Sequence, residues 1–178
     1  MKLQNTKLQG VKLITPDIFR DHRGEYCETF NYRDYRKAGV SCKFVQDDIS
    51  VSKKGVLRGI HGDDQTWKLV QCLHGSFYLA VINWDENSPD FRKCIAFTLD
   101  DVKRQQVLIP PQFGNGHYVL SDYATFHYKQ STYYGDTRQF TIKWDSVGID
   151  WPLKGTPIMS RRDNREEWSY NDPGYWSW

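Results

Sequence analysis

The chain has 178 residues, of which 39% are hydrophobic, 15% aromatic and 26% charged. This length predicts a single domain over residues 1–178, and the composition excludes collagen-like, low-complexity and membrane-spanning chains. The 24 Lys and Arg residues nearly balance the 22 Asp and Glu residues, which gives a formal net charge of +2. This balance argues against nucleic acid as a partner, so local charges must hold any anionic ligand.

The first predicted element is a short helix, which spans residues 32–38 and ends before Gly39. Short segments rich in Val, Ile, Tyr, Phe and Thr follow, separated by turn signals such as Gly75 and Pro110-Pro111. Roughly eight antiparallel strands with such turns indicate a jelly roll. The aromatic residues of the C-terminal tail, 164–178, are expected to pack on this or a neighbouring subunit. The predicted strands are 44–51, 68–73, 76–84, 94–99, 106–109, 117–120, 125–131 and 139–144.

The expected location is the cytoplasm. Every apolar run is far shorter than the ~20 residues that span a bilayer, and the first residues lack the apolar region of an export signal. The spacing of the four cysteines, Cys27, Cys42, Cys72 and Cys94, matches no paired zinc motif. A reducing compartment keeps cysteines as thiols. We therefore expect four reduced, mostly buried cysteines, no membrane partner and no metal site.

The segment 56–63 carries an arginine and a histidine beside two glycines, and Lys68 follows it. A histidine can take a proton, an ammonium can stabilise an oxyanion, and an arginine can bind a phosphate. Arg58, His61 and Lys68 therefore supply three parts of a site that forms a carbanion. Composition alone supports the other interpretation equally well: His61 is then a hydrogen-bonded core histidine, and the two cations are solvated.

A second segment, 109–122, leads into residues 126–129 and 132–134. With residues 21–24, 44–48, 58–61, 149–152 and 160–163, in the same order, it closely resembles the dTDP-4-dehydrorhamnose 3,5-epimerase (RmlC-like) family. The resemblance covers roughly residues 10 to 165. It implies an all-β fold, a cupin-type jelly roll with short helices at the ends. It also implies a homodimer and a reaction without a cofactor or a metal.

The resemblance implies a role for each matched residue. His61 is expected to be the general base, and Asp163 the carboxylate that orients it. Lys68 is expected to stabilise the enolate oxygen, and Tyr128 to return a proton to the opposite face of the sugar. Arg23 and Arg58 match the arginines around the diphosphate. The other substrate-binding positions are Glu28, Gln46, Asp48, Asn115, His117 and Tyr134.

The chain departs from the family pattern at several positions. Asn115 replaces a family histidine, with His117 two residues later, and Asp48 replaces an asparagine. A family aspartate is missing from residues 81–83, and the loop between His61 and Lys68 is shorter. The forms of residues 61–68 and 113–118 resemble the branch that acts on GDP-4-keto-6-deoxy-heptoses.

We therefore expect an epimerase that inverts C3, or both C3 and C5, of a GDP- or dTDP-linked 4-keto-6-deoxy sugar for bacterial surface polysaccharides. Two alternatives stay open. A 3,4-ketoisomerase on the same scaffold tends to carry a second histidine where this chain has Asp63. A silent sugar- or nucleotide-binding cupin would have no need of a base and an acid on opposite faces.

Overall fold

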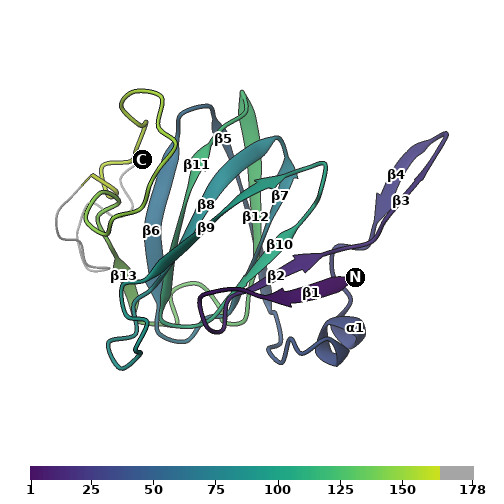
Figure 1. Ribbon diagram of the computed structural model, residues 1–178, viewed down its shortest axis with the longest axis horizontal. Coiled ribbons are helices and arrows are strands. Elements are labelled where there is room, and N and C mark those ends of the chain that lie inside the picture. The colour runs from purple at the N-terminus through teal and green to yellow at the C-terminus, as the bar shows by residue number, and fades with distance from the viewer. Residues whose placement is uncertain (165–178) are drawn as a thin grey trace.

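The computed structural model of the protein describes residues 1–164, so the predicted tail lies almost wholly outside the described residues. Within this range the chain forms thirteen strands and one helix (Figure 1). In chain order they are β1 (Lys2–Asn5), β2 (Lys12–Thr15), β3 (Ile18–Asp21), β4 (Gly24–Cys27), α1 (Tyr32–Lys37), β5 (Gln46–Lys53), β6 (Leu57–Asp63), β7 (Lys68–His74), β8 (Ser76–Asn83), β9 (Cys94–Asp100), β10 (Gln106–Ile109), β11 (Phe113–Val119), β12 (Tyr123–Gln130) and β13 (Gln139–Thr141).

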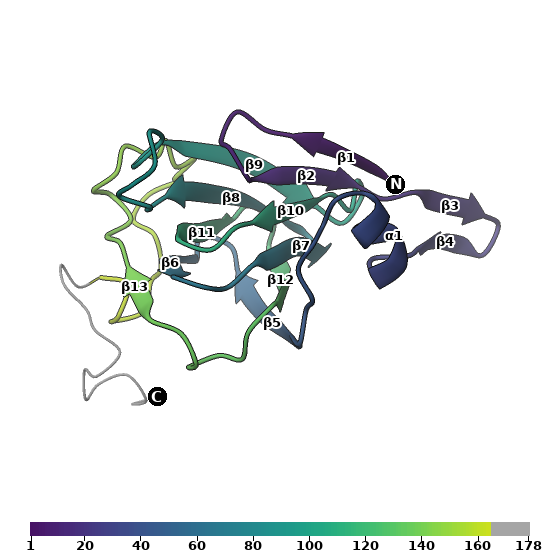
Figure 2. The same ribbon diagram turned by 90° about the horizontal axis from the view of Figure 1, so that it is seen from below.

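Two antiparallel sheets face each other across the interior (Figures 1 and 2). The six-stranded sheet has the order β1-β2-β10-β7-β12-β5, and the five-stranded sheet has the order β13-β6-β11-β8-β9. Val70 and Phe126 from the first sheet meet Phe77 and Leu79 from the second in one buried apolar cluster. Burial of such a cluster is the main favourable contribution to folding. The predicted all-β jelly roll is confirmed.

Each predicted strand overlaps a strand of the structure, and residues 106–109 coincide with β10. Strands β1 to β4 and β6 were not predicted. The first four have only four residues each, too few to show a clear alternation, and β1, β3 and β4 lie mostly at the surface. β6 contains Gly59, which weakens its strand propensity. A Cβ atom on Gly59 would lie 2.6 Å from the Cα atom of Gly116 in β11, so this residue lets the two strands approach closely.

Helix α1 covers part of the outer face of the six-stranded sheet, and the predicted helix at residues 32–38 is confirmed. The side chain of Asn31 caps its first turn by accepting hydrogen bonds from two backbone N–H groups. Buried Tyr35 donates its hydroxyl to Gln106 Oε1 in β10 at 2.6 Å. No helix in residues 1–164 is long and apolar enough to cross a membrane.

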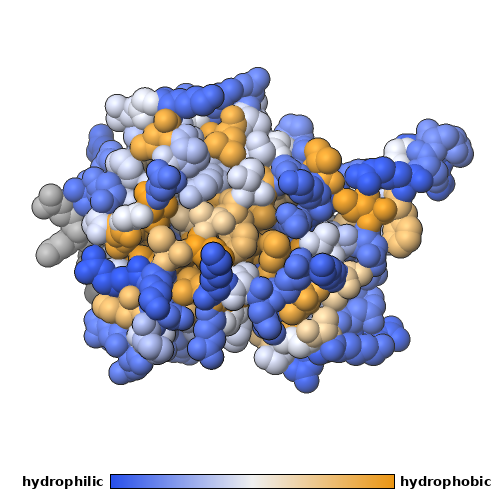
Figure 3. All heavy atoms as spheres, viewed as in Figure 1, coloured by the Kyte–Doolittle hydropathy of each residue, from blue (hydrophilic) through white to orange (hydrophobic). Residues whose placement is uncertain are grey.

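Strands β3 and β4 form an arm that projects from the body next to α1 (Figures 1 and 2). The tip of the arm is hydrophilic, and apolar residues lie near its base (Figure 3). Glu25 on β4 accepts a hydrogen bond from Arg104 Nε at 2.7 Å, which ties the arm to the loop that follows β9. The arm therefore has an anchor on the body but exposes most of its own side chains.

The four cysteines are free thiols, as expected, but only Cys72 is buried. Cys27 precedes α1 in the chain and Cys42 follows it, and both are half-buried. Cys94 is exposed at the start of edge strand β9. The prediction that most cysteines are buried is therefore wrong. The general preference of cysteine for the interior does not hold at the margins of a sheet.

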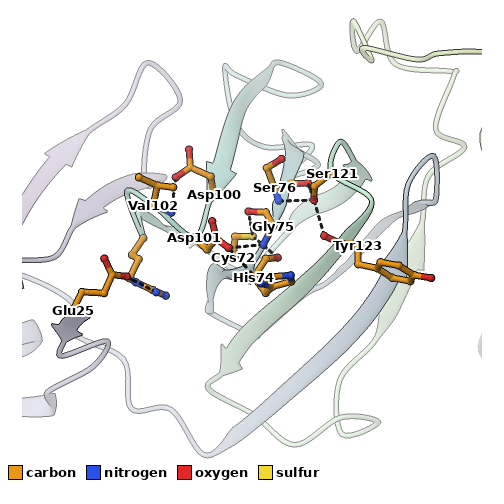
Figure 4. A network of polar contacts seen from close by, with 11 residues as sticks. Glu25, Cys72, His74, Gly75, Ser76, Asp100, Asp101, Val102, Ser121 and Tyr123 are labelled. Atoms are coloured by element: carbon orange, nitrogen blue, oxygen red, sulfur yellow. Dashed lines mark hydrogen bonds and ion pairs between the residues drawn. The ribbon is translucent and has the colours of Figure 1, made fainter. Parts of the chain in front are cut away.

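The turn between β7 and β8 is held by backbone N–H groups that donate to side chains (Figure 4). Gly75 N donates to Asp101 Oδ2 at 2.8 Å, and Ser76 N donates to Ser121 Oγ at 2.8 Å. Gly75 has φ of +74°, and a Cβ atom there would lie 2.1 Å from the carbonyl oxygen of Tyr123. The turn therefore has no room for a side chain at this position.

Gly75→Ala is expected to destabilise the fold more than Gly148→Ala. Gly148 has a similar φ of +69° but open space around its Cβ position. Both variants force alanine into the left-handed region, which costs about 1–2 kcal/mol, but only Gly75→Ala adds an overpacking cost of about 1–3 kcal/mol. Urea unfolding of the two variants measures the difference, and equal losses of stability would contradict the steric argument.

Candidate active site

A cavity of about 470 Å³ lies between the two sheets. Strands β5, β7 and β12 supply one wall, and strands β6 and β11 supply the other. The lining also includes Thr66, four residues of the segment 133–139, and Ser160, Arg162 and Asp163. The cavity brings together all predicted site residues except Arg23 and Glu28. Those that line it are Gln46, Asp48, Arg58, His61, Lys68, Asn115, His117, Tyr128, Tyr134 and Asp163.

A β-bulge in β6 turns Arg58 and His61 into the same cavity. In a regular strand, residues three apart point to opposite faces. Here Asn115 pairs with His61 and His117 pairs with Arg58, so three steps along β6 face two steps along β11. An extra residue in one strand changes which face the following side chains occupy. Both residues therefore line the cavity despite their odd spacing.

His61 and Asp163 form a hydrogen-bonded pair, with 2.6 Å between Nε2 and Oδ1. Burial lowers the pKa of His61, although Asp163 opposes this effect. Burial alone would raise the pKa of Asp163, but its hydrogen bond with His61 brings that pKa below the usual value. An ionised carboxylate only accepts, so Nε2 carries the ring proton and Nδ1 keeps a lone pair. The pair can therefore accept a proton at Nδ1.

Tyr128 comes from the opposite wall, on β12 of the six-stranded sheet. Burial, together with the nearby Asp48 carboxylate, raises the pKa of the Tyr128 phenol above its ordinary value. The phenol therefore stays protonated at neutral pH. Asp48 Oδ2 is itself held by the side-chain amides of Gln46 at 2.9 Å and Gln130 at 3.0 Å. The wall that faces His61 thus presents a proton donor.

Lys68 begins β7, and its ammonium lies 3.6 Å from Asp63 Oδ2. Both side chains are shielded from water, with 14% of Lys68 and 6% of Asp63 exposed. Burial lowers the pKa of Lys68, and the carboxylate of Asp63 opposes this shift. The cavity therefore contains a fixed primary ammonium, which can stabilise an oxyanion.

Two arginines add positive charge to the lining. Arg58 Nε donates to Ser52 Oγ at 3.0 Å across the interior. Arg162 Nη2 donates to Thr141 Oγ1 in β13 at 3.3 Å. Guanidinium groups bind phosphate oxygens through paired hydrogen bonds. The cavity can therefore accept an anionic ligand although the chain as a whole is nearly neutral.

Asn115 and His117 lie side by side on the inward face of β11. Asn115 Oδ1 is buried and has no hydrogen-bond partner among residues 1–164. The His117 ring stacks on Phe126, with 4.2 Å between centroids and 11° between planes. Burial and the charge of Arg58 lower the pKa of His117 to about 3. His117 is therefore a neutral packing residue at neutral pH, whereas Asn115 offers an acceptor to a ligand.

Arg23 and Glu28 lie outside the cavity of their own chain. Arg23 is at the tip of the arm, where its guanidinium contacts Asp21 at 2.6 Å, and 80% of its side chain is exposed. Glu28 follows β4 and accepts a hydrogen bond from Asn31 Nδ2 at 3.4 Å. Within one chain, these two predicted substrate-binding residues are therefore separated from the rest.

Several residues that line the cavity were not predicted from the sequence. Gln130 follows Tyr128 by two positions on a predicted strand, so the alternation of inward side chains identifies it. Arg162 immediately precedes Asp163, but nothing in the sequence shows where its side chain points. Asp63 stood out in the sequence only because a 3,4-ketoisomerase tends to carry a second histidine at that position. Other unpredicted lining residues are Ser50, Thr66, Phe126, Thr137, Gln139 and Ser160.

The geometry suits proton transfer next to a carbonyl group. One wall offers a base, the other offers an acid, and an ammonium is present for the oxygen that gains charge. Across residues 1–164, no group of three or more His, Cys, Asp or Glu side chains could hold a metal ion. All of these steps can be assigned to side chains that line the cavity.

Comparison with known proteins places this chain in a family. Residues 5–169 match the model of dTDP-4-dehydrorhamnose 3,5-epimerase. The chain is 36% identical over 171 residues to the Escherichia coli K12 protein of that name, covering 93% of this chain and 92% of the relative. It is 34% identical over 169 residues to the dTDP-4-dehydrorhamnose 3-epimerase of Streptomyces niveus, covering 92% and 81%.

A solved structure agrees with the sequence matches. The dTDP-6-deoxy-D-glucose-3,5-epimerase RmlC of Legionella pneumophila, in complex with dTDP-4-keto-L-rhamnose, superposes with a TM-score of 0.87. The two chains are 36% identical, and the match covers 91% of this chain and 89% of the other. The fold and the sequence agree, and this chain belongs to the dTDP-4-dehydrorhamnose 3,5-epimerase family.

Proposed function

We propose that this protein epimerises a dTDP-linked 4-keto-6-deoxy sugar at carbons next to the C4 ketone. The observation that carries the proposal is the placement of the His61–Asp163 pair and Tyr128 on opposite walls of one cavity. Inversion requires a proton to leave one face of the carbon and another to arrive on the opposite face. The dTDP-linked substrates in the names of the relatives favour dTDP over the GDP-linked sugars that the sequence also suggested.

In the proposed reaction, His61 Nδ1 takes the proton from the carbon next to the ketone. The electron pair of the C–H bond forms the enolate double bond, and the carbonyl pair moves onto oxygen beside the Lys68 ammonium. Tyr128 then donates its proton to the same carbon from the opposite face. The imidazolium and the phenolate return to their starting forms by exchange with solvent, so protons and charge balance over the cycle.

Arg58 is the proposed ligand of the diphosphate, because its guanidinium is charged, lines the cavity and is partly accessible to solvent. Arg23 has the same chemistry but lies on the projecting arm. We propose a homodimer in which the arm of each chain reaches its partner. The exposed apolar side chains on the outer face of β5 and β12 support such an association, with Ile49 at 64%, Val51 at 61% and Tyr123 at 61% exposure.

The first test is incubation in D2O with dTDP- and GDP-linked 4-keto-6-deoxy sugars, in buffer that contains EDTA. We expect NMR and mass spectrometry to locate carbon-bound deuterium next to the ketone, with the dTDP sugar as the better substrate. EDTA is expected to have no effect, because the proposed steps use side chains alone. The absence of exchange with either sugar by folded protein would overturn the proposed function, and isomerised ketone would favour the 3,4-ketoisomerase.

His61→Asn is expected to abolish deuterium exchange while the affinity for dTDP stays nearly unchanged, because the amide cannot take a proton. Arg58→Ala is the matched comparison and is expected to weaken nucleotide binding more than it lowers kcat. Calorimetric titration with dTDP and single-turnover exchange separate the two effects. If His61→Asn retains near-normal exchange, the base is another residue.

Exchange is expected to be faster at C3 than at C5, and Asn115→His should raise the rate at C5 relative to C3. The Asn115 amide brings no charge to the sugar ring, whereas hydrogen bonds from charged donors are roughly twice as strong as neutral ones. Asn115→Gln is the control, because it keeps an amide. A time course in D2O measures both positions. Equal deuterium at C3 and C5 from the earliest points would contradict the predicted bias.

A further inference from the structure

The Asp63 carboxylate is held in place by backbone hydrogen bonds. Its Oδ1 atom accepts hydrogen bonds from the backbone N–H groups of Thr66 at 2.7 Å and Gln65 at 3.1 Å. The backbone carbonyl of Asp63 accepts from Gln112 N at 2.8 Å. These bonds fix the end of β6 and the short connection to β7.

The other oxygen of this carboxylate faces Lys68. The distance of 3.6 Å between Oδ2 and Nζ joins two charges that are both withdrawn from water. The attraction between the two charges is screened less than in an exposed ion pair, and removal of one partner leaves the other charge buried and uncompensated. Besides Lys68, the titratable and charged groups that line the cavity are Arg58, His61 and Asp63 on β6, Asp48 on β5, His117 on β11, Tyr128 on β12, Tyr133 and Tyr134 after β12, and Arg162 and Asp163 after β13.

Asp63 lies on the same strand as His61 and faces the same cavity. The two residues are two positions apart on β6, past the bulge, and both line the cavity. Lys68 comes from the opposite sheet, at the start of β7. One strand therefore presents the residue proposed as the base and also the carboxylate that contacts the ammonium.

We infer that Asp63 is a positioning residue, whose carboxylate fixes the Lys68 ammonium in the cavity and keeps it charged for the enolate oxygen. This inference rests on the proposed function for its chemical meaning, but the charge pairing can be measured without substrate. Without Asp63, burial and the positive charge of Arg162 both disfavour the protonated amine. A neutral amine would stabilise the enolate far less.

The direct test titrates Lys68 by NMR in protein labelled with ¹³C at lysine Cε, its resonance identified by its loss in Lys68→Arg. Asp63→Asn removes the charge but keeps an oxygen for the two backbone N–H groups. Asp63→Ser is a second neutral variant with a hydroxyl acceptor, in case the first does not fold. We expect the titration midpoint to fall by about one pH unit or more, a tenfold change in acid dissociation. An unchanged midpoint in the neutral variants overturns the inference.

The second test measures deuterium exchange by the same variants at about pH 7 and about pH 9. We expect kcat to fall more at the higher pH, KM to change little, and Asp63→Glu to restore much of the alkaline activity. Equal losses at both pH values would mean that Asp63 only shapes the loop, and would overturn the inference. If the wild type exchanges no deuterium, the proposed function fails, while the NMR titration still decides the charge pairing.

Discussion

The hydrogen bond between His61 and Asp163 joins residues 102 positions apart, and the cavity depends on it. The segment that carries Asp163 runs beside β6, where backbone bonds of 2.9 Å link Ile158 to Gly55 and Leu57. A carboxylate this buried is stable only when donors surround it, and the Gly59 N–H supplies a second one at 3.4 Å. The hydrogen bond between His61 and Asp163 therefore also connects the last described residues to the five-stranded sheet.

Much of the fold followed from local sequence, because most interior strands are rich in Val, Ile, Tyr, Phe and Thr and are separated by turn residues. These signals failed at β6, where Gly59 weakens the strand pattern and the bulge breaks the period of two. The proposed base, His61, and the proposed acid, Tyr128, were identified from sequence motifs. Asp63 and Arg162 were not, because their importance depends on which side chain lies opposite, and that requires three-dimensional contacts. Arg23 shows the reverse case, since its motif matched but its position lies away from the cavity.

The charges in the cavity explain how a nearly neutral chain can bind an anion. Lys68 is paired with Asp63, so its charge is largely committed within the protein. Arg58 contacts a neutral serine and lies nearer to solvent, which leaves its charge available to a ligand. In the proposed reaction, this division would leave Lys68 for an oxyanion in the shielded interior and the more exposed Arg58 for phosphate. The formal charge of the chain does not reveal this division.

The bulge in β6 also constrains how this sequence can change in length. It gives β6 one residue more than the strand it faces, between Arg58 and His61. Deletion of a single residue there would restore a regular ladder and leave Arg58 and His61 two positions apart, so both side chains would still face the cavity. The same deletion between His61 and Asp63, where the strand is regular, would instead turn one of those two side chains away from the cavity. A one-codon deletion in β6 is therefore compatible with the site at the bulge but not in the regular part of the strand.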